Sequence, residues 1–249
     1  MGLHSTEAIV IAGHDLAEAD RIVVFYTRSQ GKVRAVAEGA RRLRSRFGGS
    51  LQLFSQGQLV YFERPNKTLH KVNEFAVARA HQVLREDLDR IALASALAES
   101  VALGVEEAEA FPELFDLLGE GLDALETSAR PTLILHGFTL QLLRLLGYRP
   151  EWNECLHCRR PAERLTRALL SPAQGGLVCE TCRDGVVDGL SASPEVLGFL
   201  RGAGSARLRL LDRVTLPPPA VDEAGRILQA FLRQVLGRPL RAAEFLGRL

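Results

Sequence analysis

The chain has 249 residues, a length that fits one large domain or two modest ones. Hydrophobic residues make up 47% and charged residues 24%, which excludes a disordered, collagenous or coiled-coil chain. The net charge of +1 excludes a histone-like polycation, but the charge is unevenly distributed. Residues 1–80 carry 12 basic and 7 acidic side chains, whereas residues 81–150 carry 5 and 12. The amino-terminal third therefore suits an anionic partner.

The amino-terminal residues contain no basic segment followed by an apolar one, and no apolar run approaches 18 residues. We therefore expect a cytoplasmic protein.

The first 80 residues predict a small β-barrel, because short stretches of alternating polarity are separated by turn residues. The expected strands are residues 7–11, 21–27, 32–38, 51–62 and 68–80. Five strands in about 75 residues fit an OB-fold, a partly open five-stranded barrel. An SH3-like barrel is the alternative that strand count leaves open.

The apolar period changes to that of a helix from about residue 81. Helices are predicted in residues 88–97, 114–125, 131–146, 193–201 and 221–236. The expected class is an α+β multidomain protein. Its predicted parts are an OB-fold domain (1–80), a helical domain (81–150), an inserted four-cysteine module (151–190) and the carboxy-terminal part of the helical domain (191–249).

All four cysteines lie in two CxxC pairs that are twenty residues apart: Cys155, Cys158, Cys179 and Cys182. This spacing is typical of a zinc ribbon or treble clef, in which each pair supplies two thiolates to one ion. Four thiolates complete a tetrahedron, so the sequence predicts one structural Zn²⁺ per chain. The alternatives are four reduced thiols, two disulfides, or His157 in place of one thiolate.

A cationic loop is predicted between the third and fourth strands, where four arginines fall within six residues. They are Arg41, Arg42, Arg44 and Arg46. Guanidinium groups are planar donors suited to phosphate oxygens, so we expect DNA to bind here, with Lys32 and Arg34 on the preceding strand in support. Phe47 and Tyr61 are candidates for stacking on bases. The alternative is a solvated charged loop without a ligand.

Signatures of catalysis are missing: the sequence has no phosphate-binding GxxxxGK[ST] loop, no HExxH, no GxSxG and no GxGxxG after a strand. Asp15, Glu18 and Asp20 could hold Mg²⁺ in a nuclease, but a polar turn explains them better. We therefore expect no enzymatic activity.

The amino-terminal motifs, in this order, resemble the RecO family of bacterial recombination mediators. They are residues 7–11 (EAIVI), 18–21 (EADR), 25–27 (FYT), 31–32 (GK), 38–42 (EGARR) and 45–54 (SRFGGSLQLF). The cysteine segment, with residues 170–172 (LSP) and 175–176 (GG), resembles the zinc-bearing members of that family. Arg159 departs from the pattern, since a small glycine often follows the second cysteine.

The resemblance implies an OB-fold, a helical bundle and a zinc module, with no enzymatic turnover. It implies binding of single- and double-stranded DNA, annealing of complementary strands, and loading of RecA with RecR onto strands coated by single-stranded DNA-binding protein (SSB). Such a protein works at the nucleoid. Family members that bind the acidic SSB tail use the helical domain. The alternative function is a zinc-containing docking adaptor without a direct role on DNA.

Overall fold

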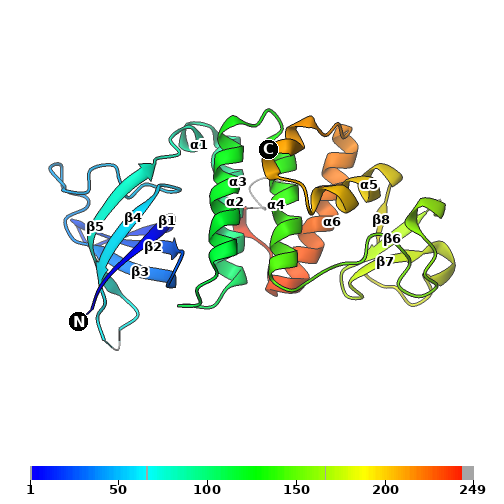
Figure 1. Cartoon of the computed structure of the whole chain (residues 1–249), viewed down its shortest axis with the longest axis horizontal. Coiled ribbons are helices and arrows are strands. Elements are labelled where there is room, and N and C mark those ends of the chain that lie inside the picture. The colour runs from blue at the N-terminus through cyan, green and yellow to red at the C-terminus, as the bar shows by residue number, and fades with distance from the viewer. Residues whose placement is uncertain (1, 66, 166, 243–249) are drawn as a thin grey trace. The chain divides into compact units, whose positions relative to one another are not determined.

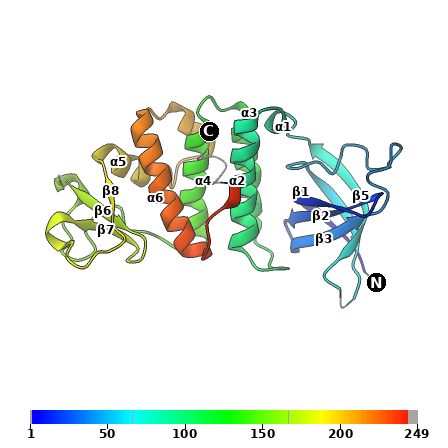
Figure 2. The ribbon, with the colours of Figure 1, turned by 180° about the vertical axis from the view of Figure 1, so that it is seen from behind.

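The computed structural model describes residues 2–65, 67–165 and 167–242 (Figures 1 and 2). The chain forms two compact units, one ending at Glu126 and the other beginning at Thr127. This division does not coincide with the four parts expected from the sequence, which remain a prediction. No helix in the described part of the chain combines the length and apolar character needed to span a lipid bilayer.

The first unit begins with a closed five-stranded barrel. Its strands are β1 (Leu3–Leu16), β2 (Asp20–Thr27), β3 (Gly31–Ala37), β4 (Gln56–Phe62) and β5 (His70–Arg79). Their order is β1-β2-β3-β5-β4, and β4 closes the barrel by pairing with β1. Only β3 and β5 pair in parallel. This is the OB-fold, so the SH3-like alternative is wrong.

The fourth strand begins at Gln56, five residues later than the sequence predicted. Apolar residues between 51 and 54 explain the error, because their burial resembles that of a strand. Leu51 and Phe54 are buried, but they lie in turns, and Phe54 has a left-handed backbone with φ of 69°. Sequence periodicity records which side chains are buried and not how the backbone reaches them.

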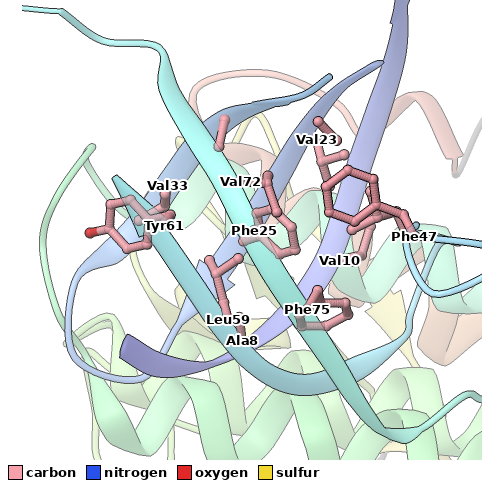
Figure 3. Close-up of a cluster of buried hydrophobic side chains, with 13 residues drawn as sticks. Ala8, Val10, Val23, Phe25, Val33, Phe47, Leu59, Tyr61, Val72 and Phe75 are labelled. Atoms are coloured by element: carbon pink, nitrogen blue, oxygen red, sulfur yellow. The ribbon is translucent and has the colours of Figure 1, made fainter. Parts of the chain in front are cut away.

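The barrel interior is filled by inward-facing side chains of all five strands (Figure 3). Phe25 and Phe75 meet at 5.3 Å between ring centroids. Phe47 and Tyr61 belong to the same core, with only 6% and 3% of their surfaces exposed. Stacking of these two rings on bases therefore stays a prediction, and their burial in this structure does not favour it.

Three helices complete the first unit: α1 (Val83–Glu86), α2 (Leu88–Gly104) and α3 (Pro112–Thr127). Helix α2 begins at a strong cap, since the Asp87 carboxylate accepts bonds from the backbone N–H groups of Asp89 (2.9 Å) and Arg90 (3.0 Å). Apolar residues on α3, including Leu114, Leu118 and Leu122, are fully buried.

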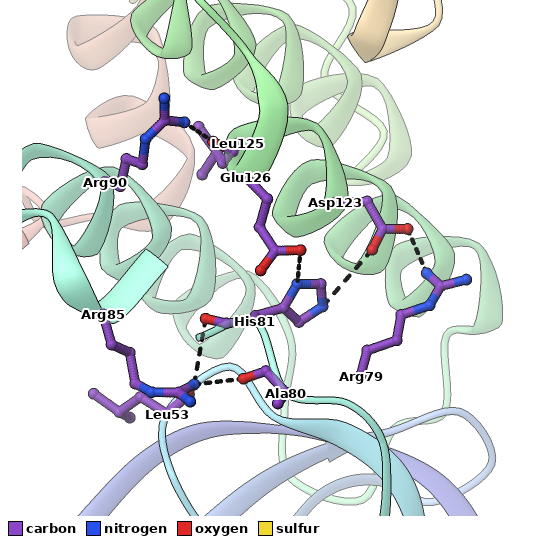
Figure 4. A network of polar contacts seen from close by, with 9 residues as sticks. All are labelled: Leu53, Arg79, Ala80, His81, Arg85, Arg90, Asp123, Leu125 and Glu126. Carbon is purple, nitrogen blue, oxygen red and sulfur yellow. Dashed lines mark hydrogen bonds and ion pairs between the residues drawn. The ribbon is translucent and has the colours of Figure 1, made fainter. Parts of the chain in front are cut away.

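A polar network ties the end of the barrel to α3 (Figure 4). His81 follows β5 with a left-handed φ of 45°, and its ring is buried between two carboxylates of α3. Its Nδ1 lies 3.1 Å from Glu126 Oε2 and its Nε2 lies 3.8 Å from Asp123 Oδ1. Arg79 pairs with the other oxygen of Asp123. The turn between β5 and α1 is thereby fixed to α3.

The second unit combines helices with a small sheet. Its helices are α4 (Pro131–Leu145), α5 (Pro194–Ala203), α6 (Pro218–Leu236) and the 3₁₀ helices η1 (Ala162–Arg164), η2 (Glu180–Cys182) and η3 (Leu208–Arg213). Its strands β6 (Ala168–Ser171), β7 (Gly176–Cys179) and β8 (Leu190–Ala192) have the order β7-β6-β8. Helix α6 begins three residues earlier than predicted, because Pro218 and Pro219 occupy its first turn, where a missing N–H costs nothing.

Candidate nucleic-acid interface and metal centre

The segment between β3 and β4 carries the arginine-rich loop, residues 39–50. Its backbone forms a series of single turns: Arg42 N donates to Gly39 O (3.1 Å), Ser45 N to Arg42 O (3.0 Å), and Gly48 N to Ser45 O (3.2 Å). Phe47, and then Leu51 just beyond the loop, insert into the barrel core. The loop is therefore anchored to the barrel at its far end, while its arginines remain on the surface.

The four loop arginines are all exposed, but their surroundings differ. Arg41 donates to Ala17 O at 2.9 Å and lies 3.3 Å from the Asp15 carboxylate. The Arg46 guanidinium lies 4.8 Å from the centroid of the Phe47 ring. The guanidinium groups of Arg42 and Arg44 have no hydrogen-bond or ion-pair partner among the residues described here. These two cations are the ones most available to an anion.

The acidic residues before the loop have structural partners. Asp20 accepts a 2.8 Å bond from the backbone N–H of Gly39, and Asp15 faces Arg41. Neither belongs to a metal-like cluster among the described residues. These contacts support the interpretation of Asp15, Glu18 and Asp20 as a polar turn that positions the loop.

Lys32 and Arg34 on β3 point to a different neighbour, which we call the acidic strap (residues 105–111). The Lys32 ammonium donates to Ala102 O at 2.9 Å, just before the strap. Arg34 forms a 2.8 Å ion pair with Glu107, and Lys32 and Glu107 are joined by a β-bridge. Both supporting cations of the sequence prediction therefore have partners within the chain, and the structure does not bring them together with the loop arginines as free cations.

The strap is closely fitted to the β2–β3 turn. Gly31 has φ of 62°, and a Cβ there would lie 2.4 Å from Glu109 O, so only glycine fits. The Tyr26 hydroxyl donates to Phe111 O at 3.4 Å. Burial, together with the nearby Glu109, raises the pKa of Tyr26. Strands 2 and 3 form the face with which OB-folds bind oligonucleotides, and here part of that face carries the chain's own carboxylates.

The four cysteines converge at one point of the second unit, with all four sulfurs within 4.8 Å of one another. Cys158 Sγ and Cys179 Sγ are 3.6 Å apart. Cys179 ends β7 and Cys182 ends η2, so the short sheet brings the second pair to the first. Arg159 follows the first CxxC pair and completes its turn with a left-handed φ of 58°, a conformation that a glycine adopts at lower cost.

The cluster's chemistry fits a thiophilic cation. Burial by itself would raise the pKa of Cys155, but backbone N–H groups of Cys158, Cys179 and His157 that point at its sulfur lower that pKa overall. Burial likewise opposes ionisation of Cys179, yet the Thr181 hydroxyl and the neighbouring sulfurs lower its pKa to about 6. The His157 ring instead bonds Gln174 at 3.0 Å, away from a ligand role. Four soft donors at this spacing can hold a metal ion in tetrahedral geometry.

Sequence reasoning missed a groove on the second unit. It has a volume of about 290 Å³ and lies along α6 and the residues that follow it. Leu190, Leu232 and Leu240 supply apolar lining, whereas Arg226, Arg233 and Arg238 supply positive charge. The signal was present in the sequence, since Arg226 and Arg233 are seven residues apart and so share one face of a helix. Such a groove suits a short peptide with acidic and apolar residues.

The comparisons with known proteins agree with this architecture. The family described as Recombination protein O N terminal matches residues 1–81, and Recombination protein O C terminal matches residues 85–244. DNA repair protein RecO of Anaeromyxobacter sp. (strain K) is 36% identical over 248 residues, covering 97% of this chain and 94% of that protein. DNA repair protein RecO of Caldanaerobacter subterraneus subsp. tengcongensis is 30% identical over 245 residues, covering 98% and 97%. From the barrel through the cysteine module to the last helix, the chain belongs to the RecO family of DNA repair proteins.

Proposed function

We propose that this protein is a recombination mediator that binds single- and double-stranded DNA, anneals complementary strands and, with RecR, helps to load RecA onto SSB-coated strands. The observation that carries the proposal is the arginine-rich loop: four exposed guanidinium groups, two of them without a partner in the described chain, on an anchored loop of an OB-fold. A DNA role implies work at the nucleoid in the cytoplasm, and no catalytic turnover is proposed.

The proposed contact is with phosphates rather than bases. Arginines that neutralise phosphates release counterions, so affinity for a single strand falls with salt by a logarithmic slope of about −0.7 per phosphate. Four loop arginines then predict a slope of roughly −3. The buried Phe47 and Tyr61 offer no ring to a base, which favours binding with little sequence preference. Lys32 and Arg34 would contact phosphates only after giving up their present partners in the chain.

For the four-cysteine cluster, we propose one Zn²⁺ held by Cys155, Cys158, Cys179 and Cys182. Bound zinc would cross-link the two ends of the module and would have no open position for a substrate, so its role is structural. The groove bounded by Arg226, Arg233 and Arg238 is proposed to receive the acidic SSB tail, since it combines three cations with an apolar floor. RecA is a partner only indirectly.

The decisive experiment compares wild type with Arg42→Ala/Arg44→Ala in DNA binding and annealing across a salt series. We expect weaker binding to all DNA ligands, a slope flattened by about 1.4, and slower annealing. The matched control is Arg28→Ala/Arg64→Ala, which removes the same charge from the same unit but from arginines already ion-paired to Glu7 and Glu38. Its slope should stay close to that of wild type.

An unchanged slope in the Arg42/Arg44 variant would contradict the loop assignment. If wild type fails to bind DNA but still captures a synthetic acidic peptide, the docking-adaptor alternative is the better description of the protein.

A further inference from the structure

A second basic surface lies on η3 of the second unit. A 3₁₀ helix has three residues per turn, so side chains three positions apart lie in one row. Leu208 and Leu211 form the inward row and are 0% and 1% exposed. Helix α4 receives them at Gly137, where an added Cβ would lie 2.2 Å from Leu211 Cδ1. This contact fixes how η3 is rotated about its own axis.

The rows that remain face solvent and carry the basic ridge, defined as Arg207, Arg209 and Arg213. All three are exposed, and none has an ion-pair partner within the described ranges of the chain. The one carboxylate on η3, Asp212, is occupied by the Ser128 hydroxyl at 2.5 Å and the Arg130 backbone N–H at 3.2 Å. The ridge therefore presents positive charge that is not paired on its own surface.

We propose that the basic ridge binds the phosphate backbone of a second DNA strand during annealing. This inference rests on the proposed function, in which two polyanions must be held by one protein. The loop and the ridge belong to different units, and each has arginines without partners, so each can neutralise one strand. Arg207 and Arg213 are six residues apart, or about 12 Å along a 3₁₀ helix, a span that covers several phosphates.

The ridge suits a nucleic acid better than an acidic peptide. A peptide partner gains specificity from an apolar pocket, as in the groove along α6. On the ridge the only exposed apolar side chain is Leu210, 42% exposed, between two arginines. An apolar pocket beside η3 is lined by Ala206, Leu211 and Val214, but none of the three ridge arginines lines it. The ridge itself therefore offers charge without a shaped pocket, and such a surface recognises a polyanion of any sequence.

The test counts binding sites for short oligonucleotides. The full-length protein, with its metal, is titrated with a labelled 8-nucleotide single strand at low salt. Wild type should bind two per chain, and Arg207→Ala/Arg209→Ala/Arg213→Ala should bind one. The ridge variant should also anneal complementary strands at least tenfold more slowly. The variant in which lysine replaces all three arginines should again bind two oligonucleotides per chain, because phosphate contact needs positive charge more than guanidinium shape.

The matched control is Arg144→Ala/Arg149→Ala/Arg164→Ala, which removes the same charge from exposed positions of the same unit and should still bind two. Fluorescence of Trp152, the only tryptophan, verifies that each variant keeps the second unit folded. One site in wild type, lost in Arg42→Ala/Arg44→Ala, would overturn the ridge and leave the proposed function standing. No binding to wild type would overturn both. A ridge variant that anneals normally but loses an acidic peptide would show a protein partner instead of DNA.

Discussion

His136 is a buried histidine in the middle of α4, with 4% of its surface exposed and an edge-on contact to Phe199 at 6.2 Å between ring centroids. Burial lowers its pKa to about 4, against a smaller opposing effect of Asp222. The folded state therefore keeps this ring neutral where the unfolded chain would protonate it.

The second unit should lose stability as pH falls from about 6.5 to about 4, because only the unfolded state takes up the proton in that range. The loss is about 1.4 kcal/mol per pH unit, or roughly 3 kcal/mol in all. His136→Leu should remove this part of the pH dependence, as measured by urea denaturation followed through Trp152 fluorescence. His14→Gln, at an exposed position, serves as the control. Identical pH profiles for wild type and His136→Leu would contradict the assignment.

At the residue scale, the spacing of residues along the chain predicted their surroundings better than residue type did. The convergence of the four cysteines could be predicted because two CxxC pairs constrain one another within a short segment. Arg34 and Arg42 look equivalent in the sequence, yet the Arg34 guanidinium is paired to Glu107 and that of Arg42 has no partner in the described chain. That difference depends on the acidic strap, more than 60 residues away, which no local pattern could reveal.

Among the elements, the acidic strap has a direct consequence for DNA binding. Glu107 pairs with Arg34 on the face that OB-folds use for oligonucleotides. Glu107→Gln should release Arg34 and remove a negative charge, so affinity for single-stranded DNA should rise a few-fold at low salt and show a steeper salt slope. Glu113→Gln, on α3, is the control of equal charge. Unchanged or weaker binding would mean that the strap does not compete with DNA.

The cysteine module should depend on its metal for folding. Structural zinc contributes on the order of 10 kcal/mol in small modules. Cys179→Ser should therefore lose bound metal and yield protein whose second unit is insoluble or locally unfolded. His157→Gln should keep its zinc, since that ring bonds Gln174. Elemental analysis of both variants and of wild type measures the zinc bound per chain. A wild-type protein that holds no metal would contradict the prediction.

Element boundaries were predictable where polarity alternates and less so where turns bury apolar residues. Strands β2, β3 and β5 lie close to their expected positions, but β4 starts late because Leu51 and Phe54 are buried from turns rather than from a strand. The same long-range packing explains why the rings of Phe47 and Tyr61 are buried. A strand pattern separates two faces of a sheet, but only the closed barrel decides that both rings are enclosed.

For the whole molecule, the division after Glu126 predicts a separable first unit. A fragment of residues 1–126 should be soluble, melt cooperatively and bind single-stranded DNA. A fragment of residues 1–80 lacks the strap and α3, and it would expose Tyr26, which is fully buried in the intact chain and packs at 6.4 Å from Phe115. We expect aggregation of the shorter fragment. A soluble 1–80 fragment with a cooperative thermal transition would show that the barrel needs no helix.

The anchoring of the arginine-rich loop has a consequence for how tightly DNA can be held. Ordering a flexible backbone costs about 1–2 kcal/mol of conformational entropy per residue, and a free loop would meet that cost at the moment of binding. Here Phe47 and Leu51 are fixed in the hydrophobic core before any ligand arrives. Part of the entropy loss has therefore already occurred during folding. The affinity of the surface for a polyanion is set partly by apolar residues that never touch it.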